Sequence, residues 1–419
     1  MNYLKILDNI SETNQIYIVG GTIRDYLLEK SINDIDMIVF NSIKDVVYKF
    51  AKKINKKVIV LDKNRNIFRV VVNENIFLDF SSPVGQDLLE DLGYRDFTIN
   101  SMAIELSKIG FNNNQLNIKK EHIIDPFNGI KDIEKHIIKV VKQSSIKKDP
   151  LRIIRAFRFA NNLNFEINSK TKKIITDDIS LIKKIKVERI REELIKFFDN
   201  KLKINIIRDF LNTNIIPVLF NLEYNNINTR NIINTLACLK KNNHYIKINN
   251  HNYIPVLITI FLELIKSNKL NYKVVEDILY SYTFNKNDVI LIRDYLYVLN
   301  NLLDNHNKYK KDDDLIYNKL YFDHIDYYEI SYIINCYHYK TDDLIVINDI
   351  IELLNKMKKR IENKKINGNT IMEILNIEPG ERVGNILKIV KKKRALGILN
   401  SKEEIKDYIV SLSKNKNNQ

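Results

Sequence analysis

The chain has 419 residues, 45% of them hydrophobic, so it is long enough to form two to four domains with buried cores. Its 67 Lys and Arg against 52 Asp and Glu give a formal net charge of +15, which favours a polyanionic partner, nucleic acid first, although solubility or genome composition also produces such a charge. No apolar run reaches membrane-spanning length and the N-terminus lacks the charged-then-apolar pattern of a signal peptide, so we expect a cytoplasmic protein with no membrane contact. Cys238 and Cys336 have no His or Cys neighbours at metal-ligand spacing, so we expect two free thiols.

The first motif in chain order is a glycine turn between an apolar run and a helical stretch. Residues 16–19 read as a buried strand, Gly20 and Gly21 break it, and residues 22–28 read as a helix. A strand, a glycine turn and a helix start bring free backbone N–H groups to one point, which forms a phosphate cradle. Arg24 in the first helical turn can clamp a phosphate oxygen.

A pair of carboxylates follows this turn. Asp34 and Asp36 lead into the apolar run 37–40, and alternate residues of a strand point to the same face. Paired carboxylates suit Mg²⁺, which also bonds substrate phosphates. Either motif alone is weak, because most Gly-Gly pairs are turns and most Asp-x-Asp pairs are solvated. Together they resemble the nucleotidyltransferase superfamily with a polymerase-β-like head, and more closely the class II tRNA nucleotidyltransferases (CCA-adding enzymes) and bacterial poly(A) polymerases.

The rest of the predicted head alternates short strands with one amphipathic helix. We expect the helix at residues 43–51 and strands at 58–61, 68–72 and 76–80. Residues 123–129 read as a strand and a Pro/Gly turn, with Asp125 as a minor site candidate.

Residues 94–103 resemble the family's Arg-Arg-Asp-Phe-Thr-x-Asn-x-Met-Ala motif. The resemblance implies that Arg95 offsets triphosphate charge, that Asp96 accepts a hydrogen bond from a ribose hydroxyl, and that Asn100 belongs to the same nucleotide site. Tyr94 stands where the family more often has Arg. A local ion pair between Arg95 and Asp96 is the alternative interpretation.

A basic and aromatic helix is predicted to begin near residue 150. Asp149 reads as its N-cap, followed by a proline at the first helical position, and Arg152, Arg155 and Arg158 recur three residues apart. The resemblance implies that Asp149 and Arg152 read the incoming base. A guanidinium donates and a carboxylate accepts, as the base edges of cytosine and adenine require.

Arg155 and Arg158 bind nucleotide in this interpretation, with bracing of the head as the alternative. Lys148 stands where many relatives have Glu. Further along, we expect Glu188, Arg189 and Glu192 to form a structural salt-bridge network.

The tail carries a basic cluster after a Pro-Gly turn at residues 379–380. Lys391, Lys392, Lys393 and Arg394 are expected to contact the RNA backbone, and a solvated lysine face is the alternative. Residues from about 205 to 355 show helical spacing and no motif with a chemical meaning.

The predicted fold class is α+β, with a nucleotidyltransferase head (1–142), a helical neck with the base-selecting helix (143–204), a helical body (205–355) and a helical, tRNA-binding tail (356–419). The resemblance implies Mg²⁺-dependent addition of C and A from CTP and ATP to the 3′ end of tRNA. CC-only addition, A-only addition and poly(A) synthesis share every motif and stay open. A non-catalytic tRNA-binding protein is the alternative from another class.

Overall fold

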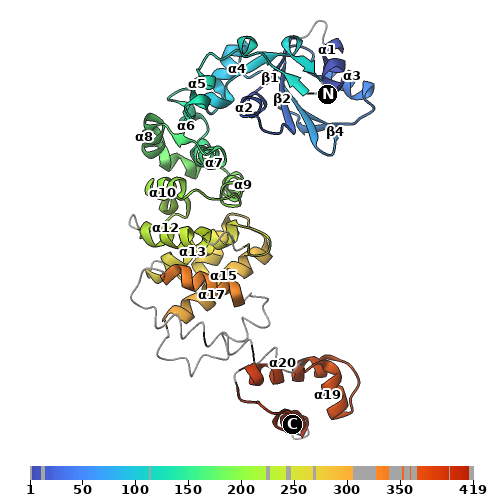
Figure 1. Cartoon of the computed structure of the whole chain (residues 1–419), viewed down its shortest axis with the longest axis vertical. Helices are drawn as coiled ribbons and strands as arrows, with labels where there is room; N and C mark the ends of the chain where they lie inside the picture. The colour runs from blue at the N-terminus through green and yellow to red at the C-terminus, as the bar shows by residue number, and fades with distance from the viewer. Residues whose placement is uncertain are drawn as a thin grey trace. The chain divides into compact units, whose positions relative to one another are not determined.

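The computed structural model describes residues 2–10, 15–112, 115–222, 227–241, 247–267, 270–304, 327–338, 352, 359, 366–395 and 397–414 (Figure 1). The chain divides into two compact units, residues 1–221 and 222–419. The first unit holds the sheet and the helices next to it in sequence, and every described element of the second unit is helical. The finer four-part division expected from the sequence stays a prediction.

A mixed six-stranded sheet forms the centre of the head, in the order β3-β4-β5-β2-β1-β6. β2 and β5 are parallel, and the other neighbours are antiparallel. The strands are β1 (Ile16–Val19), β2 (Asp34–Val39), β3 (Val58–Asp62), β4 (Ile67–Asn73), β5 (Ile76–Ser81) and β6 (Ala103–Glu105). Ile35 and Met37 are fully buried, so Asp34 and Asp36 occupy the alternate positions of β2.

Short helices and hairpins complete the head. Phe50 of α3 packs on Phe80 of β5 with ring centroids 6.0 Å apart. The remaining elements are α1 (Asn2–Ile10), α2 (Gly21–Leu27), α3 (Ile43–Lys53), α4 (Leu88–Tyr94), η1 (Thr98–Asn100), η2 (Leu106–Lys108), β7 (Gly110–Asn112), β8 (Gln115–Asn117), η3 (Lys120–His122) and α5 (Gly129–Glu134). The strand expected at 123–125 is absent from this described segment, where Ile124 forms only an isolated bridge with Ala103. Asp125 accepts from the N–H groups of Gly129 and Ile130, which supports its interpretation as a turn residue.

The neck helices pack through a cluster of phenylalanine rings. Phe157 of α7 and Phe197 of α9 each contact Phe210 of α10, at 5.3 and 5.2 Å between ring centroids. The elements are β9 (Ile137–Ile138), α6 (Ser145–Lys148), α7 (Arg152–Leu163), β10 (Glu166–Ile167), α8 (Ser169–Asp178), η4 (Ile179–Lys184), α9 (Val187–Phe198), α10 (Ile204–Asn212) and α11 (Ile215–Leu219). This apolar cluster fixes α7 and α9 beside each other.

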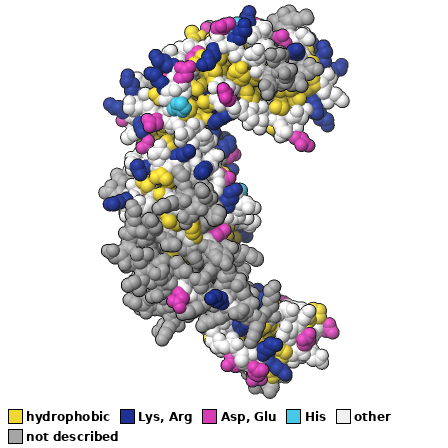
Figure 2. Space-filling model, in the orientation of Figure 1, with side chains coloured by type: hydrophobic (Ala, Val, Ile, Leu, Met, Phe, Trp, Pro, Cys, Tyr) yellow, Lys and Arg dark blue, Asp and Glu magenta, His cyan; other side chains and the backbone are white. Residues whose placement is uncertain are grey.

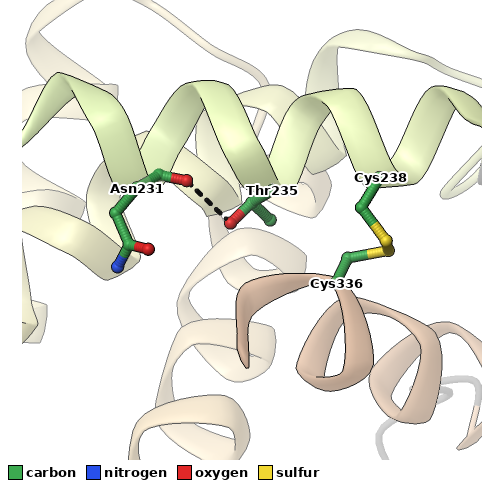
Figure 3. The surroundings of a disulfide bond; sticks show 4 residues. All are labelled: Asn231, Thr235, Cys238 and Cys336. Carbon is green, nitrogen blue, oxygen red and sulfur yellow. Dashed lines mark hydrogen bonds between the residues drawn. A yellow bond between two sulfur atoms is a disulfide. The ribbon is translucent and has the colours of Figure 1, made fainter. Parts of the chain in front are cut away.

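In the second unit, α12 and α17 are joined by a disulfide between Cys238 and Cys336 (Figure 3). The expectation of two free thiols is therefore wrong: the pairing brings together residues 98 positions apart, a separation that spacing along the chain does not reveal. The helices here are α12 (Thr229–Lys241), α13 (Tyr253–Lys266), α14 (Tyr272–Ser281), α15 (Lys286–Asp304) and α17 (Tyr327–His338). Among the described helices, none is long and apolar enough to cross a membrane.

The last three described helices share a small core of their own. Ile371 of α19, Val390 of α20 and Ile409 of α21 are fully buried together. Their bounds are α19 (Gly368–Leu375), α20 (Glu381–Ala395) and α21 (Lys402–Lys414). The predicted α+β class, with a small mixed sheet followed by helices, is confirmed.

Candidate active site

Head and neck together line an open cavity of about 470 Å³. Backbone from the glycine turn, both carboxylates of β2 and several arginines face it. Its lining residues are Gly20, Gly21, Thr22, Arg24, Asp25, Asp34, Asp36, Arg95, Asp96, Asn100, Asp149, Leu151, Arg152, Arg155, Phe159 and Arg189. Nearly all the predicted nucleotide-site residues therefore meet at one place, with Arg158 as the exception.

Asp34 and Asp36 stand at the cavity wall beside the glycine turn. The Thr22 hydroxyl accepts from the Asp36 N–H at 3.1 Å and donates to the Asp34 carbonyl at 3.3 Å, which ties the start of α2 to β2. Burial raises the pKa of the Asp36 carboxyl above its usual range, and the Arg95 guanidinium opposes this rise. The nearby Asp79 and Asp34 carboxylates raise it further.

The donor set fits Mg²⁺. Both carboxylates are hard oxygen ligands that line the cavity. Among the described residues, no group of three or more His, Cys, Asp or Glu is placed to hold a metal. Two carboxylates leave most positions of an octahedral ion to water and to substrate phosphate oxygens.

A third carboxylate, which sequence reasoning missed, lies next to this pair. Asp79 on β5 is in register with Asp36 on β2, and both its oxygens accept from Arg69 at 2.7 Å. Arg69 also lies 4.0 Å from an Asp34 oxygen. The apolar residues of 76–80 predict a strand, but a single acidic residue in such a run does not indicate a site.

Gly20 makes the cradle possible because of its backbone conformation and its neighbours. Its φ is +70°, and a Cβ at this position would lie 2.7 Å from an Arg95 guanidinium nitrogen and 3.7 Å from an Asp36 oxygen. Arg95 is in turn held by Asp91, at 3.1 Å from its Nε. A residue with a side chain at position 20 would displace the Arg95 guanidinium from its place beside Asp36.

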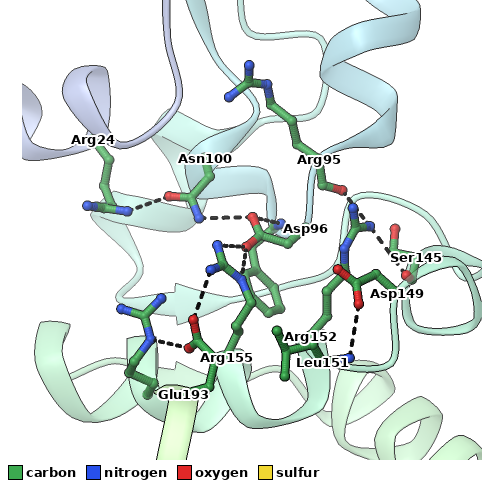
Figure 4. A network of polar contacts seen from close by, with 12 residues as sticks. Arg24, Arg95, Asp96, Asn100, Ser145, Asp149, Leu151, Arg152, Arg155 and Glu193 are labelled. Carbon is green, nitrogen blue, oxygen red and sulfur yellow. Dashed lines mark hydrogen bonds and ion pairs between the residues drawn. The ribbon is translucent and has the colours of Figure 1, made fainter. Parts of the chain in front are cut away.

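A chain of hydrogen bonds joins the cradle to the neck (Figure 4). Arg24 donates to the Asn100 side-chain oxygen at 2.5 Å, and the Asn100 amide donates to Asp96 at 3.0 Å. Asp96 then accepts from Arg155 of α7 at 2.6 and 2.9 Å. Burial alone would raise the pKa of Asp96, but the Arg155 charge and the hydrogen bonds from Asn100, Arg155 and the Phe97 N–H outweigh it and lower that pKa.

Two arginines of α7 are braced by Glu193 of α9, which sequence reasoning missed. Arg158 Nε lies 2.7 Å from Glu193, and Arg155 lies 3.4 Å from it. The guanidinium groups of Arg24, Arg155 and Arg158 all lie over the Phe159 ring, at 4.3–5.2 Å from its centroid. These contacts favour the bracing interpretation for Arg158, and a nucleotide contact by Arg155 stays a prediction.

The predicted base-reading residues lie on the neck side of the cavity, each already engaged (Figure 4). Arg152 donates to the backbone carbonyls of Tyr94, Arg95 and Ser145. Asp149 pairs with Arg189 at 2.9 Å. Asp149 is not the N-cap of α7: it ends α6 in an extended conformation, as Pro150 after it requires, and α7 begins at Arg152.

Tyr94 and Lys148, the two residues that depart from the family motifs, contact each other. Lys148 Nζ lies 4.0 Å from the centroid of the Tyr94 ring, in a cation–π arrangement. Because the Tyr94 carbonyl also accepts from Arg152, this contact supports the segment on which Arg152 rests.

The basic residues of the tail belong to the other unit. Lys391 and Lys393 are half-buried on α20, Arg394 is buried, and the side chain of Lys392 lies outside the described part of the structure. On the face drawn in Figure 2, Lys and Arg side chains are spread among Asp and Glu rather than gathered in one patch. An RNA contact by the 391–394 cluster stays a prediction.

Two family models match parts of the chain on either side of α7. Residues 16–139 match the poly A polymerase head domain, and residues 164–223 match the probable RNA and SrmB-binding site of polymerase A. These two stretches are similar to the poly(A) polymerase family. The family resemblance predicted from the sequence motifs is thereby confirmed.

Curated relatives match up to about half of the chain. A CC-adding tRNA nucleotidyltransferase of Geobacter sulfurreducens is 35% identical over 184 residues, which cover 44% of this chain and 40% of that protein. A CCA-adding enzyme of Lactobacillus helveticus is 34% identical over 194 residues, 43% of this chain and 45% of that protein. The matched region spans about half the length or less of these two relatives.

Solved structures of CCA-adding enzymes share the fold over nearly the whole chain. The Thermotoga maritima CCA-adding enzyme complexed with tRNA has a TM-score of 0.71 at 21% identity, covering 98% of this chain and 94% of that one. A complex of a CCA-adding enzyme with ATP gives a TM-score of 0.72 at 22% identity, with the same coverage. At these identities the likeness establishes the fold, including the helical part for which the sequence offered no motif.

Proposed function

We propose that this chain is a tRNA nucleotidyltransferase that adds C and A from CTP and ATP to the 3′ end of tRNA, completing or repairing CCA. The observation that carries the proposal is the shared cavity: the Asp34–Asp36 pair and the Asp149–Arg152 pair line the same space of about 470 Å³. Chemistry and base choice can then act on one nucleotide. The names of the relatives from Geobacter sulfurreducens and Lactobacillus helveticus support the same reaction.

The reaction is a phosphoryl transfer in which the tRNA 3′-hydroxyl attacks the α-phosphate and pyrophosphate leaves. Asp34 and Asp36 would hold Mg²⁺, which activates a hydroxyl and neutralises charge on phosphate oxygens when bound. The backbone at Gly20 and Gly21, with Arg24 and Arg95, receives the triphosphate. Asp96, whose carboxylate accepts from Arg155 and Asn100, positions these groups. In this proposal it also accepts from a ribose hydroxyl of the nucleotide.

Base choice falls to the neck side of the cavity. The Asp149 carboxylate accepts from an exocyclic amine, and the Arg152 guanidinium donates to ring and carbonyl acceptors. The four-part organisation of head, neck, body and tRNA-binding tail, and a cytoplasmic location where tRNA, CTP and ATP meet, belong to this proposal.

A second candidate is CC-only addition, which the name of the Geobacter sulfurreducens relative favours. It uses the same residues and differs only in the nucleotide at which addition stops.

The test uses three tRNA transcripts that end before CCA, after the first C, and after CC. Each is incubated with the purified chain, Mg²⁺, CTP and ATP, and the 3′ ends are sequenced. Completed CCA on all three substrates is the expected result. Products that end at CC identify the second candidate, long A tails identify a poly(A) polymerase, and binding without any extension contradicts nucleotidyl transfer.

A further inference from the structure

Arg189 is a cavity residue that reaches the proposed base-reading carboxylate from another helix. It lies in the first turn of α9, and its Nη2 donates to Asp149 Oδ2 at 2.9 Å. Its side chain is 51% exposed and that of Asp149 is 29% exposed, so the pair stands at the cavity wall where a nucleotide can reach it. The sequence pattern of residues 187–194 suggested only a local salt-bridge network.

Asp149 is held on two sides by this arrangement. One oxygen accepts from Arg189, and the other accepts from the Leu151 N–H at 3.3 Å. An ionised carboxylate has about four acceptor positions, so both oxygens keep capacity for a further donor. The two contacts orient the carboxylate without saturating it.

Arg152 does not perform this orienting role. Its guanidinium donates to three backbone carbonyls, and among the described contacts of Asp149 no hydrogen bond to Arg152 occurs. The donor half and the acceptor half of the base-reading pair are therefore positioned separately, the first by backbone of the head and the second by α9.

We propose that Arg189 is a positioning residue that sets base selection by holding the Asp149 carboxylate toward the incoming base; this inference rests on the proposed function. Cytosine and adenine offer an exocyclic amine where uracil and guanine offer a carbonyl oxygen. A fixed carboxylate accepts from the amine and repels the carbonyl, whereas a carboxylate free to rotate does both less well. Arg189 thereby favours amine-bearing bases without contacting the triphosphate.

The test is single-nucleotide addition to a tRNA that ends before CCA, with kcat and KM measured separately for CTP and UTP. Arg189→Met keeps the length and the apolar stem and removes the donor. We expect it to lower the preference for CTP over UTP about tenfold, mainly by lowering kcat for CTP and raising it for UTP. Arg189→Lys, which keeps one charged donor, should restore part of the preference.

Arg191→Met is the matched control, because Arg191 lies on the same helix, faces Glu192 at 3.9 Å and is outside the cavity lining. It should keep the wild-type preference. Equal slowing of CTP and UTP by Arg189→Met, with the preference unchanged, would make Arg189 a brace and overturn the inference while leaving the proposed function intact. A wild-type chain that adds no nucleotide to any tRNA would overturn both.

Discussion

At the scale of single residues, the site depends on Gly20. Its backbone combines φ +70° with ψ −130°, a conformation that residues with side chains disfavour. The missing Cβ leaves room for the Arg95 guanidinium, because a Cβ here would lie 2.7 Å from one of its nitrogens. One glycine thus determines both the path of the chain into α2 and the position of a positive charge beside Asp36.

Gly20→Ala should lower the free energy of unfolding by roughly 1–3 kcal/mol, the cost of forcing a Cβ into such a backbone conformation. It should also raise KM for CTP, because Arg95 must move away from the cradle. Urea denaturation and steady-state kinetics measure the two effects.

Gly384→Ala is the matched control, since a Cβ at this helical position in α20 meets nothing within 4 Å. It should leave KM unchanged and alter stability by no more than about 1 kcal/mol in the favourable direction. A Gly20→Ala variant as stable and as tight for CTP as the wild type contradicts the role assigned to this turn.

At the scale of elements, α7 is joined to the head through buried charges. Arg155 bridges Asp96 of the head and Glu193 of α9, and Arg158 strengthens the second contact. Because a buried ion pair loses much when one partner is removed, this network couples the order of the neck to that of the nucleotide site.

Asp96→Asn should lower the free energy of unfolding by about 3–5 kcal/mol at pH 7, because Arg155 then loses a charged partner. The folded state lowers the pKa of Asp96, so its contribution is present above the ordinary Asp value and is lost as pH falls through that value toward the folded one. Wild type should therefore lose stability in acid more steeply than Asp96→Asn, as measured by denaturation between about pH 7 and pH 3.

Asp209→Asn provides the control for this comparison. Asp209 pairs with Lys172 at 2.6 Å, but both side chains are more than a third exposed, Asp209 at 35% and Lys172 at 43%. An exposed pair contributes about 0–1 kcal/mol, so this variant should stay close to wild type. Parallel acid profiles for wild type and Asp96→Asn would mean that Asp96 is not the residue that the network stabilises.

Sequence patterns predicted the strands of the head and the Asp34–Asp36 pair, because both depend on the period of a single strand. They did not predict Glu193 as the brace, since its choice over the adjacent Glu192 depends on which face of α9 meets α7. The Arg189–Asp149 pair and the Tyr94–Lys148 contact were missed for a similar reason, because their partners are 40 and 54 positions apart. Packing of α9 within the neck forms the first pair, and packing of the neck on the head forms the second.

At the scale of the whole molecule, the proposed chemistry lies within residues 1–221, whereas the proposed tRNA-binding tail lies in the second unit. The family models cover residues 16–139 and 164–223, which lie almost entirely in the first unit. The fold similarity to a CCA-adding enzyme, at 21% identity, extends over the helical remainder. Helical spacing in the sequence predicted helices there but not their arrangement. The pairing of Cys238 with Cys336 is a feature of that remainder alone.

In the proposed mechanism, Asp36 serves chemistry and Arg152 serves base choice, on different walls of one cavity. The most direct measurement is addition of each of the four nucleotides to a tRNA ending before CCA, by wild type, Asp36→Ala and Arg152→Ala. We predict that Asp36→Ala loses transfer of every nucleotide by orders of magnitude. Arg152→Ala should keep triphosphate binding and lose about tenfold to a hundredfold of the preference for CTP over UTP and GTP. Near-normal turnover by Asp36→Ala, or equal slowing of all four nucleotides by Arg152→Ala with the CTP preference kept, would contradict the account.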